Sequence, residues 1–497
     1  FERFDATKNE LFSLSSGSKR LAGSLSDKLE ITAYFTADLP PPFNATERYV
    51  RDILAEYQAA SKGKIKVSFI NPDTDAEKEQ AQKDGVSAVK HQVIENDGVS
   101  VKEGFRGLVM RYLDREEIVP VIENTEGLEY LLTSRIKQLQ GDKVPIAILT
   151  GHGEASSASG LAGLGRCMPT YEFRDVTADA DIAPDTKALL IVGATEAIPE
   201  DQLRRINKYV MEGHSLAVFG GGMKIDLEQG AAAVPIDTGL NALLKPWGVT
   251  LKPGIAADAN CSRGPLRTQF GVVGVPHPPV PIVLFDEAKS ENPVLFRLSS
   301  ATLPFMEPLG LGTAPGGAKL TALAETSENS WLMTGERIDL QPKDPREIDT
   351  SGPTGPFTLL ATVSGTLPSA FPNNASVAAE APATIEAPDS SKTPVRVLVA
   401  GGALFVRDEA MPQPQGQEQC PMTNNVALAL NAVDWLTQDS DLIAVRAKNV
   451  EDPAIDVPSD VQAAEDAART AQDSVVAAAQ VGDAANAEKA SKERDDA

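Results

Sequence analysis

Residues 143–154 read KVPIAILTGHGE, and this stretch predicts how the second half of the chain folds. Residues 144–149 form an apolar run with the length of a buried strand, and Gly151 and Gly153 mark a tight turn directly after it. In parallel α/β sheets, short apolar strands that end in glycines present a site at the carboxyl edge of the sheet. We therefore expect a doubly wound α/β domain from residue 143 onward, and a smaller, separate α/β unit before it.

Apolar and amphipathic segments continue to alternate beyond this turn. They predict strands at 171–176, 188–193 and 215–219, and helices at 159–168, 199–211 and 238–244. The same pattern returns near the end of the chain, with a strand at 395–400, a helix at 424–437 and a closing strand at 442–445. We assign residues 143–250 and 395–450 to one α/β domain.

Between these two parts, residues 252–394 lose the regular pattern and are rich in proline, glycine, serine and threonine. This composition predicts a β-rich or partly disordered insertion, with short strands at 281–285, 319–325 and 357–364 and disorder at 368–392. From residue 459 to 497 the chain is charged, rich in alanine and poor in large apolar residues. That last segment is expected to be a solvated helical stalk.

The first 140 residues predict a polar lead-in segment at 1–28 and a small α/β domain at 29–140. The expected elements are a helix at 18–25, a strand at 29–35, a helix at 46–60 with Thr46 as its N-cap, a strand at 64–70, a helix at 75–83, strands at 89–95, 104–113 and 117–122, and a helix at 125–140. The strand–helix–strand start predicts that its two strands are parallel. The order of elements is that of a thioredoxin-like fold, a comparison made at the level of the fold alone.

A thioredoxin-like redox enzyme carries its CxxC motif just after the first strand. In this chain the corresponding residues 36–42 read TADLPPP and contain no cysteine. Because the thiolate is the reactive species, thiol–disulfide chemistry is excluded at this position. A binding or spacer role is expected for this domain instead.

The charge of the chain excludes one class of partner. Its 46 basic and 70 acidic residues give a formal net charge of −24, whereas nucleic-acid binding requires a basic surface. The same charge disfavours docking of the whole chain on an anionic membrane. No run of about 18 apolar residues is present, so no segment of the sequence is expected to span a bilayer. The chain starts without methionine and ends within its charged tail, so anchors in segments outside it remain compatible with these observations.

Few residues are available for metal or thiol chemistry. The three cysteines (Cys167, Cys261 and Cys420) form no CxxC or Cys/His cluster, and the four histidines show no HxH or HExxH spacing. We therefore expect no metal and no cofactor. The expected role of the cysteines is packing, although a thiol nucleophile with partners distant in sequence stays an alternative.

Several short motifs, in the same order along the chain, resemble the extracytoplasmic region of gliding-motility-type ABC transporter auxiliary components. These motifs are RFDAT at 3–7, FSLS at 12–15, the strand and turn at 31–42, GFRGL at 104–108 with IVP at 118–120, LEY at 128–130, LTGHGE at 149–154, NAVDWL at 431–436 and VR at 445–446. The insertion contributes least to the resemblance, and the acidic tail after residue 456 has no counterpart in the family.

The resemblance implies a bacterial inner-membrane protein whose region shown here lies in the periplasm or at the cell exterior. It would be tethered through transmembrane segments outside this chain and would act with ABC permease and ATPase subunits. It also implies that the second domain is similar to class I glutamine-amidotransferase-like domains, many of which are non-catalytic binding modules. An envelope protein or a glycan is the expected ligand, an oligomer is compatible with this role, and gliding motility itself does not follow from the resemblance.

The candidate site residues lie in two glycine-containing turns. Gly151, His152, Gly153 and Glu154 follow the first strand of the second domain, and their side chains could supply a general base or contact a ligand or partner. The glycine run Gly220-Gly221-Gly222 follows a later strand and could bind an anion, but no nucleotide-binding motif accompanies it. A class I amidotransferase requires a nucleophilic cysteine on such a turn, and this run contains neither cysteine nor serine.

We therefore expect a non-catalytic extracytoplasmic auxiliary subunit of an ABC transporter complex, which binds a partner or ligand or transmits force in the cell envelope. Two alternatives remain. One is a hydrolase or amidotransferase-like enzyme that uses the turn at 151–154 with residues distant in sequence. The other is a solute- or glycan-binding protein.

Overall fold

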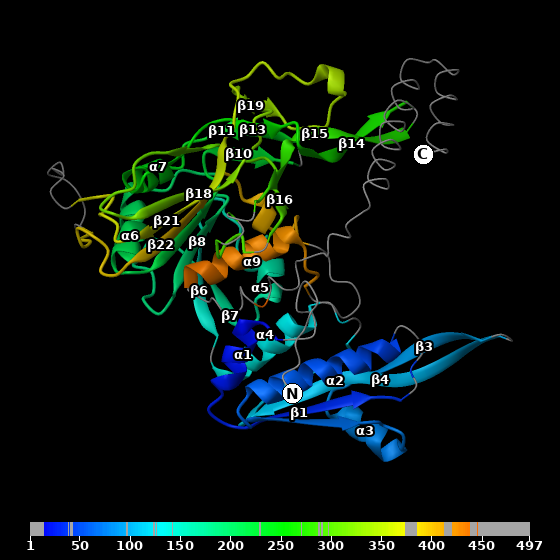
Figure 1. Cartoon of the computed structure of the whole chain (residues 1–497). Helices are drawn as coiled ribbons and strands as arrows, with labels where there is room; N and C mark the ends of the chain where they lie inside the picture. Colours follow the sequence, from blue (N-terminus) through cyan, green and yellow to red (C-terminus); the bar gives the residue numbers. More distant parts are fainter. Residues whose placement is uncertain are drawn as a thin grey trace. The chain divides into compact units, whose positions relative to one another are not determined.

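The computed structural model describes residues 14–437 apart from 38, 40–42, 96–97, 123–124, 126, 142, 228–229, 270, 287–288, 290–291, 297, 373–384 and 412–419, together with residue 445. For residues 44, 91–95 and 98–103 it describes the backbone alone. Residues 1–13 of the lead-in segment, residues 442–444 of the closing strand and the predicted stalk at 459–497 lie outside the described residues. Within them, the chain is a mixed α/β protein with several sheets, as predicted (Figure 1).

The N-terminal part contains one five-stranded sheet, in the order β2-β1-β4-β3 with β5 paired to β4. Strands β1 and β2 are parallel, which confirms the prediction from the strand–helix–strand start, whereas β4 is antiparallel to β1, β3 and β5. The elements are α1 (Ser16–Gly23), β1 (Leu29–Phe35), α2 (Phe43–Ala60), β2 (Ile65–Ile70), α3 (Asp75–Lys83), β3 (Ala88–Glu95), β4 (Gly98–Tyr112), β5 (Arg115–Val119) and α4 (Leu128–Gln140).

Helices cover both faces of this sheet. Val50, Ile53, Leu54 and Tyr57 of α2 are buried with residues of α1 and α4 against one face, and α3 contributes Ala81 to a smaller cluster on the other face. The prediction that Thr46 caps α2 is wrong. The helix begins at Phe43, one turn earlier, and Thr46 is buried within its first turn.

The second part contains a nine-stranded sheet, in the order β12-β17-β21-β22-β9-β8-β6-β7 with β18 paired to β21. Its elements up to residue 251 are β6 (Val144–Leu149), α5 (Ala162–Cys167), β7 (Tyr171–Val176), β8 (Ala188–Val192), α6 (Glu200–Met211), β9 (Ser215–Phe219), β10 (Met223–Asp226), β11 (Ala232–Pro235), α7 (Leu240–Leu244), the 3-10 turn η1 (Lys245–Trp247) and β12 (Val249–Leu251). The later elements are β13 (Ile255–Asp258), β14 (Cys261–Thr268), β15 (Gly271–Leu284), β16 (Ser300–Thr302), β17 (Leu309–Leu311), β18 (Lys319–Glu325), β19 (Ser330–Met333), β20 (Ile338–Asp339), η2 (Pro345–Glu347), β21 (Thr358–Gly365), β22 (Val395–Ala400), η3 (Leu404–Val406) and α9 (Asn424–Thr437).

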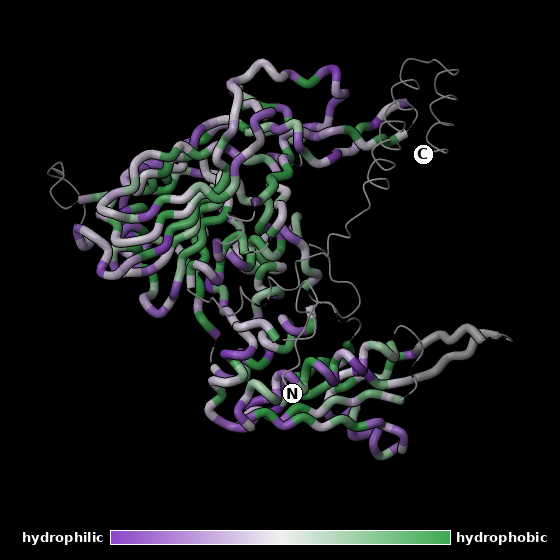
Figure 2. The backbone as a smooth tube through the Cα atoms, in the orientation of Figure 1, coloured by the Kyte–Doolittle hydropathy of each residue, from purple (hydrophilic) through white to green (hydrophobic). Residues whose placement is uncertain are grey.

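Five neighbouring strands of this sheet, β7, β6, β8, β9 and β22, are parallel. All residues of β8 and β9 are buried, as expected for central strands with helices on both faces, and Figure 2 shows the apolar segments gathered in this sheet. One core contains residues of α5 and α9, and the other contains residues of α6 and α7. The parallel sheet covered on both faces is the arrangement predicted from the run at 143–154.

Residues 252–394 extend the large sheet and also build smaller sheets. Strands β17, β18 and β21 continue it with antiparallel pairing, whereas β14, β15 and β16 form a separate three-stranded sheet. Disorder was predicted for 368–392, and this is wrong for the described ends of that segment. The Ser369 N–H donates to the Asp389 carbonyl (2.8 Å), and the Ser391 N–H donates to the Leu367 carbonyl (2.8 Å).

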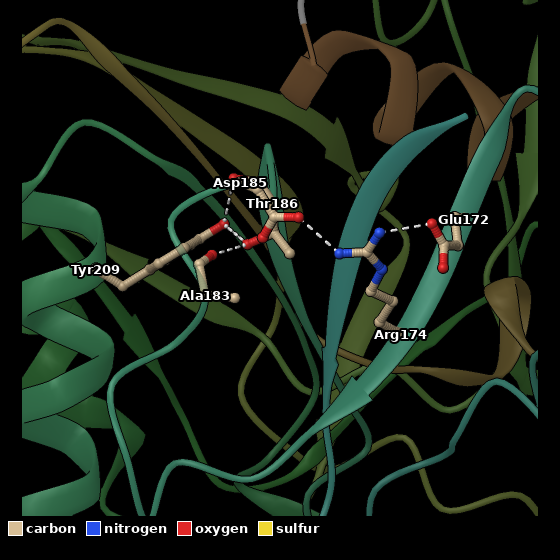
Figure 3. Close-up of polar contacts among 6 residues, drawn as sticks. All are labelled: Glu172, Arg174, Ala183, Asp185, Thr186 and Tyr209. Carbon is tan, nitrogen blue, oxygen red and sulfur yellow. Dashed lines mark hydrogen bonds and ion pairs between the residues drawn. The ribbon is translucent and has the colours of Figure 1, made fainter. Parts of the chain in front are cut away.

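The edge strand β7 is tied to the loop before β8 by charged side chains (Figure 3). Arg174 pairs with Glu172 and with Asp185, each at 2.7 Å, and these hydrogen bonds raise the pKa of its guanidinium group. Next to Asp185, the hydroxyl groups of Thr186 and Tyr209 lie 2.9 Å apart and join this loop to α6. Exposed pairs of this kind contribute little stability, but charge on an edge strand hinders pairing with another chain.

Candidate functional site

Four parallel strands of the large sheet end at the same edge, and a glycine lies just beyond the carboxyl end of each. These glycines are Gly151 beyond β6, Gly193 after β8, Gly220 after β9 and Gly401 after β22. The φ angles of the first three are +120°, +72° and +70°, a region that other residues adopt only with strain. The local sequence therefore turns the backbone sharply at the edge where α/β proteins place their sites.

The turn after β6 is held by its own side chains. The Glu154 carboxylate accepts a hydrogen bond from the His152 N–H at 2.6 Å, and its other oxygen lies 3.1 Å from His152 Nδ1. The Glu154 side chain is fully buried. The His152 carbonyl accepts from the N–H groups of Thr195 and Glu196 (2.9 and 3.0 Å). Both polar side chains thus bond within the turn, and the loop after β8 holds its backbone.

The glycine run after β9 faces a carboxyl group supplied by the chain itself. Glu307 accepts a hydrogen bond from the Gly222 N–H at 3.0 Å, and the Gly221 N–H also stabilises its charged form. A side chain at position 222 would collide with this carboxyl group, so the close approach requires glycine. The N–H groups expected to hold a bound anion therefore face the Glu307 carboxyl group.

Burial dominates the electrostatics of Glu307. The residue is fully buried, and loss of solvation raises the pKa of its carboxyl group to about 8 against the opposing effect of the Gly222 and Gly221 amides. Its second oxygen, Oε2, accepts no hydrogen bond from the described residues. At neutral pH the group is therefore largely protonated.

A pocket of about 280 Å³, just below the usual size range of small-ligand sites, opens at this sheet edge, and Glu307 does not line it. Five glycines contribute to its lining, and its polar side chains come from three segments: the turn after β8, strand β10 and the residues after η3. The lining includes Gly193, Thr195, Gly220, Gly221, Lys224, Asp226, Phe305, Gly401, Gly402, Leu404, Arg407 and Glu409. Because glycine has no side chain, a ligand or a partner's side chain can contact the backbone closely at these positions.

Charges of both signs surround this pocket. Arg407 pairs with Glu409 at 2.9 Å, while its Nε has no hydrogen-bond partner among the described residues. The guanidinium group lies between two glycines, because added Cβ atoms at Gly160 and Gly193 would be 3.6 and 4.0 Å from its nitrogens. Lys224 adds an exposed cation. The arrangement can bind a polar ligand through paired donors and acceptors.

The structure brings the two predicted turns to the same edge, but it gives them different positions. Gly220 and Gly221 line the pocket, and Gly222 faces Glu307. The turn at 151–154 does not line it, yet Gly153 packs on Thr195, which does. Cysteine, serine and histidine are absent from the described residues that line the pocket, and no metal-binding cluster of three His, Cys, Asp or Glu side chains occurs among the described residues.

Two of the three cysteines pack in the core, as expected, but they are also bonded to each other, which was not predicted. Cys167, at the end of α5, forms a disulfide with Cys420, which precedes α9, with a Cα–Cα distance of 5.1 Å. Cys261 is free and half-buried, and burial raises the pKa of its thiol. The amidotransferase-like alternative would need one of these sulfurs as its nucleophile, and two of the three are joined to each other.

Three residues of the site were not predicted. Glu307 stands alone as an acid in the apolar stretch LPFMEPL at 303–309, and this isolation is a signal that could have identified it. Thr195 and Arg407 carry no such signal. They reach the pocket only because β8 and β22 lie on either side of β9 in the sheet, so the turns that follow them flank the glycine run.

A sequence model of the family described as "ABC-type uncharacterized transport system" matches residues 143–432, which is more than half of the chain. The chain belongs to this family. The resemblance to ABC transporter auxiliary components is thereby confirmed, and membership associates the chain with an ABC-type transport system. A domain of unknown function also matches residues 8–111.

One relative of this chain is an uncharacterized protein of Borreliella burgdorferi. The two are 23% identical over 340 residues, which is 67% of this chain and 66% of that protein. The match thus spans just under two thirds of the relative's length.

Two solved structures are similar at a low level. The mmIFT52 N-terminal domain is 14% identical with a TM-score of 0.34, and the match covers 59% of this chain and 97% of that domain. The exo-β-1,4-mannosidase Op5Man5 from an Opitutaceae bacterium is 11% identical with a TM-score of 0.21, covering 62% and 45%. Scores this low carry no information on fold or function. None of the helices in the described part of the chain has the length and apolar character needed to cross a bilayer.

Proposed function

We propose that this family member is a non-catalytic auxiliary subunit of an ABC transporter complex, and that its sheet-edge pocket recognises an envelope protein, a glycan or another polar ligand. Force transmission between the transporter and that ligand is compatible with the same role. The proposal rests on family membership and on the chemistry of the sheet edge, where the glycine run faces the chain's own Glu307.

The position of Glu307 is the observation that carries the proposal. An acyl-transfer enzyme stabilises a developing oxyanion with free backbone N–H groups beside its nucleophile. At this sheet edge the Gly222 N–H already donates to a carboxyl group of the same chain. The remaining surface offers glycine backbone, a hydroxyl group and charged pairs, which supply contacts for recognition.

The finer architecture is also part of the proposal. We assign residues 29–140 to a thioredoxin-like domain without CxxC, 143–250 and 395–450 to an amidotransferase-like α/β domain, and 252–394 to its insertion. Residues 1–28 are assigned to a lead-in segment and 459–497 to a helical stalk. The order of elements and the parallel sheet with helices on both faces support the two domain assignments.

The proposed location is the outer side of a bacterial inner membrane, in the periplasm or at the cell exterior, with the tether in segments outside this chain. The Cys167–Cys420 disulfide supports it, because structural disulfides persist in oxidising compartments and are rare in the cytosol. Permease and ATPase subunits are the proposed partners.

The experiment is affinity purification of the tagged, full-length protein from its native membranes, with identification of co-purified proteins after mild cross-linking. We expect an ABC permease and its ATPase to be recovered. Arg407→Gln, which alters the pocket, is expected to reduce recovery of the recognised partner at least severalfold. Arg204→Gln is the matched control, since Arg204 is also a partly exposed arginine paired with an acid (Glu200, 2.6 Å), but it lies on α6.

Two results would count against different parts of the proposal. If neither the permease nor the ATPase is recovered with the wild-type protein, the assignment as an auxiliary subunit fails. If Arg407→Gln and Arg204→Gln behave alike, recognition at the pocket fails while the assignment to a transporter complex stands. A hydrolytic activity that His152→Ala abolishes in a folded protein would favour the enzyme alternative.

A further inference from the structure

Strands β14 and β15 form a two-stranded ribbon that projects from the insertion (Figure 1). Their antiparallel register runs from Arg263 opposite Pro276 to Thr268 opposite Gly271, and β16 pairs with β15 only at residues 282–284. At the rise of an extended strand, the six residues 263–268 reach roughly 20 Å. Isolated ribbons of two strands are barely stable in water, so an exposed ribbon of this length calls for a function.

The long edges of the ribbon are protected against strand addition. Pro265 on β14 and Pro276 on β15 each lack the backbone N–H that a further strand would need. Natural sheets use proline in this way to prevent edge-to-edge association. Contact through the edges is therefore disfavoured, and the tip is the part of the ribbon that is available for contact with another surface.

The ribbon tip, defined here as residues 266–269 and 271–273, presents apolar and uncharged groups with one arginine. Val272 is 64% exposed, and Leu266 and Val273 are half-buried. The Thr268 hydroxyl donates to the Gly271 carbonyl at 3.0 Å, which closes the turn. Burial of this exposed valine in another apolar phase would be favourable, because it removes apolar surface from water.

The charge of the ribbon is opposite to that of the chain. Residues 261–284 contain Arg263 and Arg267 and no aspartate or glutamate, whereas the whole chain has a net charge of −24. Charges are screened beyond about 8–10 Å at physiological salt. A tip that projects farther than this distance responds to its own arginines, so the overall charge does not prevent it from approaching an anionic surface.

The size of the tip distinguishes between two kinds of partner. A stable protein–protein interface requires about 800 Å² from each side, and the end of a ribbon two strands wide offers much less. A bilayer surface requires only a few apolar groups and nearby cations, because each adds to a partition equilibrium. We propose that the ribbon tip inserts into the surface of an anionic lipid bilayer and gives this envelope protein a membrane contact of its own.

Vesicle flotation with the purified 497-residue chain tests this contact without any partner protein. Vesicles of phosphatidylcholine with an equal part of phosphatidylglycerol are compared with vesicles of phosphatidylcholine alone. We expect binding to the anionic vesicles that weakens as salt is raised. Arg267→Gln should lower the partition coefficient roughly fivefold, and Val272→Asp roughly tenfold.

Leu284→Asp is the matched control, since Leu284 lies on the same strand and is 68% exposed but is outside the tip. It should bind like the wild type, and circular dichroism should show all three variants folded. The proposal is overturned if the wild-type chain does not float with anionic vesicles, or if Val272→Asp and Leu284→Asp bind equally. Loss of a co-purified membrane protein in Val272→Asp without any vesicle binding would assign the tip to a protein partner and would also overturn it. None of these results depends on the sheet-edge pocket.

Discussion

At the residue level, Glu307 joins three segments that are distant in sequence. Its side chain accepts from the Gly222 N–H after β9, and its own N–H donates to the Gly401 carbonyl after β22 at 2.7 Å. The fully buried carboxyl group favours the protonated form, which holds its proton to about pH 8. A residue of this kind makes the stability of the sheet edge depend on pH.

Glu307→Gln should remove that dependence. The folded state binds the Glu307 proton more tightly than the unfolded state, where the pKa is near 4.5, so the contribution of this group is complete below pH 4.5 and is lost as the pH rises to about 8. The wild-type free energy of unfolding minus that of Glu307→Gln should therefore fall by about 1.4 kcal/mol per pH unit within this window. Urea denaturation at several pH values between 5 and 8 measures it.

Glu325→Gln provides the control for this series, because Glu325 is partly exposed and paired with Lys289 at 2.9 Å. Its pH profile should remain parallel to that of the wild type. A Glu307→Gln profile that is also parallel to the wild type would show that the buried carboxyl group is not protonated in the folded state.

At the level of elements, the segment at residues 303–309, just before and into β17, connects the insertion with the turn after β22. Residues 303–309 donate backbone hydrogen bonds to Pro281, Pro279 and Gly401 and accept others from Ala256 and Lys252. Their backbone approaches the turn after β22 so closely that a Cβ atom at Gly401 would collide with the Glu307 carbonyl. The absence of a side chain at position 401 thus determines how the insertion meets the sheet.

Gly401→Ala should therefore lower the free energy of unfolding by about 2–3 kcal/mol, because the backbone of one of two packed segments must shift. Gly312→Ala is a suitable control, since its added Cβ would meet no atom closer than 3.7 Å. Guanidinium denaturation of both variants measures the difference. Equal midpoints for the two would contradict the close approach.

At the level of the whole molecule, the Cys167–Cys420 disulfide joins positions separated by 253 residues. It connects α5 with the segment that leads into α9, and both helices pack in the same core. Closing so long a loop restricts the unfolded chain strongly. The insertion lies entirely within this loop, so the bond constrains its two ends together.

The double variant Cys167→Ala/Cys420→Ala should lower the free energy of unfolding by about 2–5 kcal/mol, and reduction of the wild-type protein should have a similar effect. Cys261→Ala, which removes the free thiol, should change stability much less. Thermal melts with and without reductant give these values. Titration of the unreduced, unfolded protein should find one free thiol per chain, and three would refute the bond.

The features that the sequence predicted correctly are those that depend on residues close to one another in the chain. The strands at 29–35, 171–176, 215–219 and 395–400 were predicted at their observed positions, because continuous or alternating apolar residues identify them locally. The start of α2 was placed too late, because residues before Thr46 also join the helix. The long ribbon strands were missed except for residues 281–284, because glycine and proline interrupt their apolar pattern.

The sequence by itself determined the mixed α/β architecture, the glycine turns at 151–154 and 220–222 and the family to which the chain belongs. These features depend on short apolar runs and on glycines whose positions are visible in the chain. Only the tertiary structure decided that Glu307 faces the Gly222 amide, that Thr195 and Arg407 complete the pocket, and that Cys167 and Cys420 are bonded. The physical reason is that each of these contacts joins residues tens to hundreds of positions apart, whose proximity depends on the packing of the entire sheet.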